Sequence, residues 1–295
     1  MDLDVLKKIK PTIIGHDNPD VDSISSGLLL EKLFKYLDID AIFTICEESI
    51  EKTIQSVLNK FDIDISSRLN GRVSENLFLV DHHETRHKGH VIGAIDHHAT
   101  IKKYSYFYYI NEASSSTTLH IYNLMIKYNY PITEYEATLI VLGAYTDTCS
   151  LSSSKTRESD KVIIKRLIKE FNLDEKKFYK EGLLLRDLET MHINDIINNG
   201  LKVYTFGEHT IKSSYLRVGS ISDLDLVSKE LIRNITPHIR STSITSWILI
   251  VVALYDSKTM EIHITNKDVQ TFIHDGILSR GKDIMPKIEL NLLTA

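Results

Sequence analysis

Four times in its N-terminal half, the chain ends a short apolar run with aspartate and histidine side chains. The segments read IIGHDNPDVD, LFLVDHHE, VIGAIDHH and GAYTDT. Carboxylates this close in sequence repel one another unless cations lie between them. Because ligands of open α/β sheets bind at the carboxyl ends of the strands, we expect these four strand ends to meet at one edge of a sheet.

The segments between these groups alternate between strand and helix patterns. TIIG, AIFTI, NLFLVD and VIGAID predict strands, and the apolar spacing of SISSGLLLEKLFKYLD predicts a helix. SSSTTLHIYNLMIKY also predicts a helix, whereas TEYEATLIVLGAYTDT fits a helix or a buried strand. SDKVIIKRLIKEFNLDEKKFYKEGLLL predicts two amphipathic helices. The alternation indicates an α/β fold with a parallel sheet covered by helices.

The C-terminal third has a different, β-rich pattern. LKVYTFGEHTIKSSYLRVG predicts a hairpin around Gly207, and SWILIVVALYD predicts a buried strand. A chain of 295 residues also fits two domains of roughly 150 residues each. We therefore predict one domain at residues 1–187 and a smaller α/β domain at residues 195–295.

Composition and charge exclude some classes of protein. The net charge of −5 argues against a general nucleic-acid binder, which carries a basic stripe. Cys46 and Cys149 are far apart and predict no disulfide framework. The N-terminus lacks the apolar core of a signal peptide, and the longest apolar run, WILIVVALY, is too short to cross a bilayer. We expect a cytoplasmic protein with no membrane partner.

The residue types in the four groups indicate metal binding. Histidine and carboxylate ligands without a thiolate suit Mn²⁺, Co²⁺, Mg²⁺ or Zn²⁺, and the excess of ligands suggests two ions that share a carboxylate. A single aspartate in such a place is more often a helix cap or turn residue. Four groups at matching places favour a shared site. Asp17 receives no role.

The same residues resemble the motifs of the DHH phosphoesterases. GHDNPDVDSISSG is similar to the first motif of the manganese-dependent (family II) inorganic pyrophosphatases, G-H-x-N-P-D-x-D-S. VDHHE, IDHH and TDT resemble the second, third and fourth motifs, and LSRGKDIMP resembles the S-R-K segment of the DHHA2 domain. The resemblance implies a DHH metal-binding catalytic domain, a DHHA2-like substrate-binding domain and an active site in the cleft between them.

The resemblance also implies roles for individual residues. It implies two divalent cations, Mn²⁺ first, with Co²⁺ or Mg²⁺ as alternatives, and a metal-bridged hydroxide as the nucleophile. The implied metal ligands are His16 and Asp20 for one ion, Asp22, His97 and Asp147 for the other, and Asp81 as the bridge. His98 would contact substrate and protonate the leaving group, so the implied catalytic residues are Asp81 and His98. The further substrate-binding residues would be Lys202, Arg280 and Lys282.

Three positions depart from the motifs of these pyrophosphatases. The second motif has His83 where the family usually has asparagine, the third has Ala99 where arginine often follows, and S-R-K-K becomes S-R-G-K with Gly281. Lys282 is the next cation, but neighbouring residues of a strand point to opposite faces. These changes leave the length of the substrate open.

The function expected from the resemblance is metal-dependent hydrolysis of inorganic pyrophosphate to two orthophosphates. The alternative is an exopolyphosphatase-like hydrolase of short or long polyphosphate, which His83 and Gly281 favour. A nuclease or cyclic-dinucleotide phosphodiesterase fits less well, because the glycine-rich C-terminal motif of those relatives is missing. A non-catalytic phosphate-binding protein is the remaining alternative. The partner would be a small phosphoanhydride, and a homodimer is compatible with the sequence.

Overall fold

The structure is a computed structural model. It describes residues 3–100, 102–153, 156–182, 192–221, 228–241, 244–254 and 256–294. The chain forms two compact units, one of residues 1–151 with 156–184 and one of residues 152–155 with 185–295. The predicted boundary between residues 187 and 195 falls mostly outside the described residues and stays a prediction.

The first unit contains a five-stranded sheet in which all neighbouring strands are parallel. The order is β2-β1-β3-β4-β5, with bounds Thr12–Ile14 (β1), Ile42–Thr44 (β2), Asn76–Val80 (β3), His90–Asp96 (β4) and Tyr108–Asn111 (β5). The predicted parallel sheet is therefore confirmed. Strand β5 was not predicted, because its residues are half-buried and show no clear alternation.

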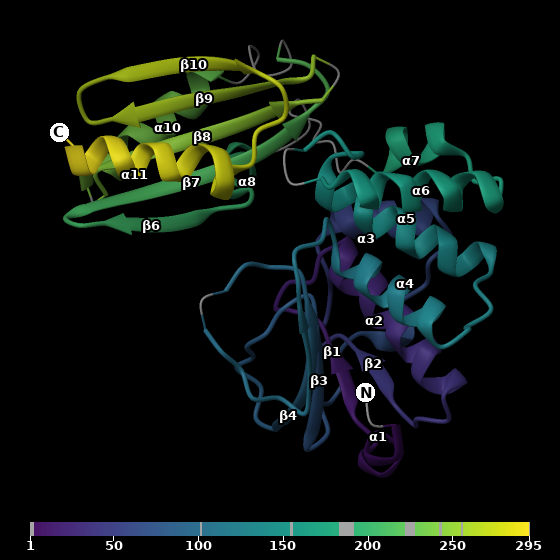
Figure 1. Ribbon diagram of the computed structural model, residues 1–295. Helices are drawn as coiled ribbons and strands as arrows, with labels where there is room; N and C mark the ends of the chain where they lie inside the picture. Colours follow the sequence, from purple (N-terminus) through teal and green to yellow (C-terminus); the bar gives the residue numbers. More distant parts are fainter. Residues whose placement is uncertain are drawn as a thin grey trace. The chain divides into compact units, whose positions relative to one another are not determined.

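Helices accompany this sheet along the chain (Figure 1). Their bounds are Leu3–Ile9 (α1), Val21–Tyr36 (α2), Lys52–Lys60 (α3), Thr117–Lys127 (α4), Glu134–Thr148 (α5), Glu158–Glu170 (α6) and Glu175–Glu181 (α7), with a 3₁₀ turn at Ser66–Arg68. Helices α2, α4 and α5 pack against one another. Both faces of the sheet are covered, which explains why its strands read as continuous apolar runs.

The two faces of the sheet have different covers. Ile13 and Phe78 belong to the large core that includes the buried side chains of α2, α4 and α5. Leu77 lies in a smaller cluster, where Tyr106 and Tyr109 pack against the strands. Aromatic side chains of β5 and of the segment that precedes it thus lie on the second face.

The ambiguous apolar stretch before Asp147 is a helix. A capping box, in which the side chains of Thr133 and Glu136 each accept a hydrogen bond from the other residue's backbone, begins α5. The following residues are buried around the whole circumference, so the helix lacks the polar face that would have identified it. Asp147 lies in the last turn of α5. The expectation that all four acidic groups follow strands is wrong for Asp147.

The second unit has its own five-stranded sheet, in the order β10-β9-β8-β7-β6. The bounds are Lys202–Phe206 (β6), His209–Val218 (β7), Ser246–Ala253 (β8), Lys258–Thr265 (β9) and Val269–Asp275 (β10). Only β7 and β8 are parallel, and the other pairs are antiparallel. The predicted β6–β7 hairpin is confirmed, with Gly207 at a φ of 58° in its turn.

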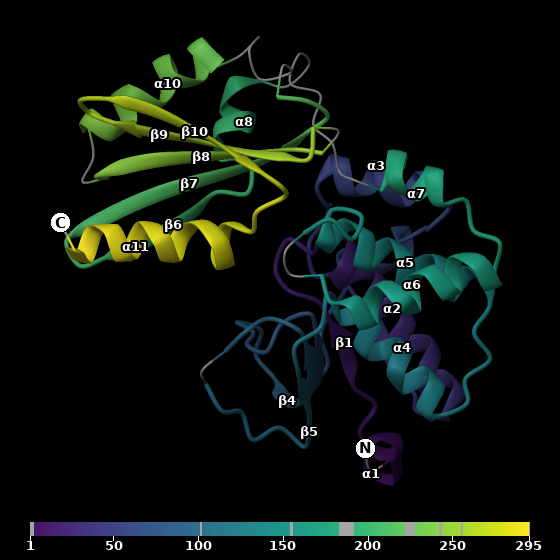
Figure 2. The same ribbon diagram turned by 45° about the horizontal axis from the view of Figure 1, so that its top comes forward.

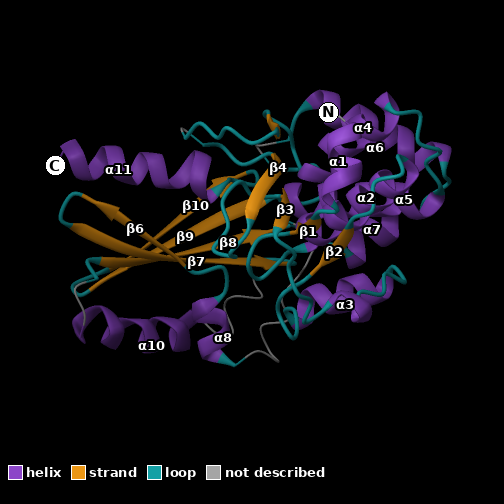
Figure 3. Cartoon of the chain, turned by 90° about the horizontal axis from the view of Figure 1, so that it is seen from below, coloured by secondary structure: helices purple, strands orange, loops and turns teal. Residues whose placement is uncertain are grey.

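Helices lie on both faces of the second sheet, as Figures 2 and 3 show. Helices α8 (Ile193–Asn198) and α10 (Ser228–Ser241) pack on one face, and α11 (Met285–Thr294) lies on the other. The α/β fold class is confirmed for both units.

The segment that carries Arg280 and Lys282 is helical. Arg280–Ile284 forms a short π-helical stretch that leads into α11. The rule that strand neighbours face opposite sides, used above for Lys282, therefore does not apply. In the described part of the chain, no helix is long and apolar enough to span a membrane.

Candidate metal centre

Strand ends and two helices bring seven side chains together in the first unit. His16 and Asp20 come from the connection between β1 and α2, and Asp22 lies in the first turn of α2. Asp81 follows β3 directly, and its φ of 65° is one that aspartate tolerates better than most residues. The remaining side chains are His97 and His98, which follow β4, and Asp147 of α5.

The potential ligand atoms form three groups of three within 4.8 Å of one another, and one of them, Asp81, His97 and His98, shares Asp81 and His97 with the other two. The first group is His16, Asp20 and Asp81, and the second is Asp22, His97 and Asp147. Asp81 lies between them: its Oδ2 is 3.5 Å from His16 Nε2, and its Oδ1 is 3.5 Å from His97 Nε2. One carboxylate thus presents one oxygen to each group, as a bridging ligand would.

The nitrogen atoms of His97 test whether a cation fits. Nδ1 lies 3.2 Å from the Ser114 carbonyl, so it carries the proton and leaves a lone pair on Nε2. Nε2 is buried without a hydrogen-bond partner among the described residues, 3.3 Å from Asp147 Oδ2 and 3.9 Å from Asp22 Oδ2. The lone pair of Nε2 and the nearby carboxylate oxygens repel one another, and a cation between them would remove this repulsion. The donors are histidine nitrogen and carboxylate oxygen, without a thiolate, and they therefore fit a divalent metal ion.

The shifted pKa values of the potential ligands also indicate a cation site. Burial, together with the charges of Asp81 and Asp147, raises the pKa of Asp22 well above its usual value. Burial opposes the charged form of His16, but hydrogen bonds with Asp20 and Asp81 raise its pKa to about 11. A proton on His16 thus neutralises part of the negative charge of Asp20 and Asp81. Bound metal ions would neutralise the same charge in place of the proton.

The N-terminus of α4 holds two of the carboxylates in place. The backbone N–H groups of Thr117 and Thr118 donate to Asp22 Oδ2 and Oδ1, at 2.7 and 3.1 Å. The Thr117 hydroxyl donates to Asp81 Oδ1 at 2.8 Å. Helix N-termini favour anions. This role of Thr117 was not predicted, although the SSSTT run at the start of a predicted helix was a signal for it.

A second set of contacts holds His98. Asp96 is fully buried, and its Oδ1 accepts from His98 Nδ1 at 2.8 Å and from the His98 N–H at 3.1 Å. Its Oδ2 accepts from His83 Nδ1. His98 Nδ1 is also 3.8 Å from Asp81 Oδ1, but the closer Asp96 oxygen already engages it. His98 is therefore a poor metal ligand through Nδ1, and its half-exposed ring leaves Nε2 for other contacts.

The cations expected to bind phosphate lie in the second unit. Arg280 Nη1 donates to the carbonyls of Gly200 and Ser213, at 2.6 and 3.0 Å, and the guanidinium lies 5.6 Å from the Tyr215 ring centre. Burial lowers the pKa of Arg280. Lys202 is the strand partner of Ser213, whose carbonyl accepts from Arg280, so the backbone of Lys202 is one strand away from this contact. Lys282 is exposed.

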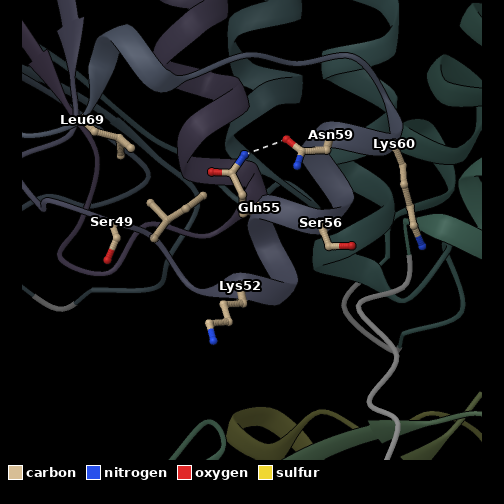
Figure 4. Close-up of a pocket in the computed structure, with 8 residues that line it drawn as sticks. Ser49, Lys52, Gln55, Ser56, Asn59, Lys60 and Leu69 are labelled. Atoms are coloured by element: carbon tan, nitrogen blue, oxygen red, sulfur yellow. Dashed lines mark hydrogen bonds between the residues drawn. The ribbon is translucent and has the colours of Figure 1, made fainter.

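A hollow of about 500 Å³ on α3 has no part in this centre (Figure 4). Lys52, Gln55 and Asn59 line it, and Gln55 donates to Asn59 at 2.8 Å. None of its lining residues belongs to the two ligand groups.

Comparisons with known proteins agree with the motifs. The DHH family N-terminal domain matches residues 10–144. A "manganese-dependent inorganic pyrophosphatase" of Methanothrix thermoacetophila is 22% identical over 94% of this chain and 96% of its own length. A "probable manganese-dependent inorganic pyrophosphatase" of Clostridium acetobutylicum is 23% identical, with the same coverage.

A solved structure extends the likeness of the fold to both units. It is described as a "putative family II inorganic pyrophosphatase" of Methanococcus jannaschii. It superposes with a TM-score of 0.70 at 21% identity and covers 94% of this chain and 98% of its own. Residues 10–144 thus match the DHH family N-terminal domain, and the chain resembles, over nearly its whole length, the manganese-dependent inorganic pyrophosphatases.

Proposed function

We propose that this protein is a metal-dependent hydrolase that splits inorganic pyrophosphate into two orthophosphates. The observation that carries the proposal is Asp81, whose two oxygens face two separate groups of potential metal ligands. The names of the full-length relatives support the same activity.

The two groups would hold two divalent cations, with Mn²⁺ as the first choice. His16 and Asp20 would bind one ion, Asp22, His97 and Asp147 the other, and Asp81 both. When bound, the cations would neutralise phosphate charge and lower the pKa of a water between them.

The protein's own contacts hold these ligands before substrate arrives. Asp20 caps α2, with its Oδ1 2.9 Å from the Ser23 N–H. The N–H groups at the start of α4 fix Asp22, and the Ser114 carbonyl fixes the tautomer of His97. Ligands held in this way need little reorganisation during the reaction.

Residues beyond the ligands would act on the substrate. Asp96 holds the Nδ1 proton of His98, so Nε2 is the atom that would contact a phosphate oxygen and deliver a proton to the leaving group. Arg280 uses one terminal nitrogen on two carbonyls, and its other N–H groups would bind phosphate. Lys202 and Lys282 would add positive charge to the leaving phosphate.

Phosphate release from metal-stripped protein tests the activity. Mn²⁺, Co²⁺ or Mg²⁺ is added back, and pyrophosphate is compared with tripolyphosphate and long-chain polyphosphate. Metal-stimulated release that is greatest from pyrophosphate supports the proposal. Release mainly from the longer chains would assign the protein to the exopolyphosphatase-like alternative, and no release from any substrate would refute hydrolysis.

Asp81→Ala tests the bridging role. Calorimetric titration with Mn²⁺ should give two sites in the wild type and lose paired tight binding in the variant, together with activity. Asp40→Ala is the matched control, because Asp40 is an exposed carboxylate that pairs with Lys10. Normal turnover by Asp81→Ala would exclude the bridge.

A further inference from the structure

Among the described residues, two histidines make the hydrogen bonds to the buried Asp96 carboxylate. Its Oδ1 accepts from the backbone N–H and Nδ1 of His98, and its Oδ2 accepts from Nδ1 of His83. These are its described side-chain hydrogen bonds, and Asp96 itself is inaccessible to solvent. Each of the two imidazoles thus donates a hydrogen bond to a different oxygen of the Asp96 carboxylate.

The contacts define the tautomers of both rings. An ionised carboxylate only accepts hydrogen bonds, so each Nδ1 carries a proton. Nε2 of His98 is then the nitrogen left to meet a ligand. The direction in which it points depends on where Asp96 Oδ1 lies.

His83 is well placed to fix that oxygen. Its carbonyl accepts from the Tyr106 hydroxyl at 2.7 Å, and its ring lies 5.2 Å from that of Tyr104. Its side chain is 19% exposed. A held ring that binds Oδ2 prevents the carboxylate from rotating, so Oδ1 stays under His98. Without this donor, Oδ2 would be a buried acceptor with no partner, and the carboxylate would turn or take up water.

We propose that His83 is a positioning residue, which acts through Asp96 to aim His98 at the substrate. This inference rests on the proposed function, because it uses His98 as the residue that meets the leaving phosphate. It gives His83 no contact with metal or substrate. A shift of about 1 Å in a reacting group can cost roughly 100-fold in rate.

If His83 acts by donating to Asp96, a replacement residue must also donate a hydrogen bond to Oδ2. Asparagine Nδ2 is separated from Cα by the same number of bonds as histidine Nδ1, so His83→Asn can keep the hydrogen bond to Oδ2. Leucine has similar bulk and no donor. His90→Asn is the matched control, because His90 is exposed at the start of β4.

The kinetic experiment measures kcat and KM for pyrophosphate with saturating Mn²⁺. For His83→Leu we expect kcat to fall about 10- to 100-fold, with little change in KM. His83→Asn should stay within about threefold of the wild type, as should the control. A normal kcat for His83→Leu, or a loss in His83→Asn as large as in His83→Leu, would overturn the proposal.

A spectroscopic readout separates this inference from the proposed function. Histidine ¹⁵N NMR of the metal-free protein should show His98 with a protected proton on Nδ1, which His83→Asn retains and His83→Leu exposes to exchange. If the wild type hydrolyses nothing, the proposed function fails, and the NMR comparison still decides whether His83 orders His98. Identical His98 signals in all three proteins would refute the positioning role.

Discussion

Thr117→Val removes one hydroxyl from the centre of the candidate metal site and keeps the shape of the side chain. The hydroxyl donates to Asp81 Oδ1 at 2.8 Å, and both residues are buried. The backbone N–H of Thr117, which donates to Asp22, stays in place. The substitution therefore isolates one hydrogen bond to the proposed bridging carboxylate.

The size of the effect follows from that bond. A hydrogen bond to a charged group contributes about 1.5–3 kcal/mol, and removal of a partner that orients a metal ligand weakens metal binding by about 10- to 100-fold. We expect Thr117→Val to raise the Kd for Mn²⁺ by that factor. Activity should recover as the Mn²⁺ concentration is increased, because the ligands themselves are intact.

The assay is calorimetric titration of metal-stripped protein with Mn²⁺, with thermal unfolding as a check on folding. Thr117→Ser retains the hydroxyl and serves as the control, with a Kd near that of the wild type. Equal Mn²⁺ affinity in Thr117→Val and the wild type would refute the reasoning. So would a serine variant as weak as the valine variant, because the hydroxyl would then not be the cause.

Three further predictions concern packing, charge and pH. Gly143→Ala would place a Cβ 2.6 Å from Thr118 Cγ2 and 2.8 Å from Asp22 Oδ1. The free energy of unfolding, measured in urea, should therefore fall by about 1–3 kcal/mol. An unchanged free energy of unfolding would contradict the close packing. A Cβ at position 281 meets no atom within 4 Å, so Gly281→Lys can be accommodated and should lower the KM for pyrophosphate. Equal KM values for Gly281→Lys and the control Gly281→Ala would show that a lysine at this position does not limit binding. In chelator-treated protein, the pKa of about 11 for His16, against its ordinary 6.5, leaves an extra proton on the folded state above pH 6.5. The free energy of unfolding should therefore fall from about pH 7 to about pH 9, by at most about 1.4 kcal/mol per pH unit, and saturating Mg²⁺ should remove this slope; a melting temperature that rises with pH would contradict it.

The fold was predictable where the local pattern has one interpretation. The short apolar runs of β1, β3 and β4 each end in polar residues and alternate with a helical pattern, so a parallel sheet follows. Helix α5 was ambiguous, because a helix buried on all sides has no polar stripe. Strand β5 gave no signal, because only its pairing with β4 makes it a strand.

The order of the strands along the chain was enough to predict that the side chains at three strand ends meet at the candidate metal centre, although Asp147 comes from helix α5. Residues that end parallel strands must share one edge of the sheet, so the gathering of His16, Asp81 and His97 follows from sequence order. The contacts that hold these side chains depend instead on how the elements pack. The hydroxyl of Thr117 on Asp81 and the ring of His83 on Asp96 are contacts between elements, and their distances depend on how α4 and the loop after β3 pack against the sheet. Sequence spacing fixes neither, because side-chain contacts between separate elements arise only when the whole core is assembled.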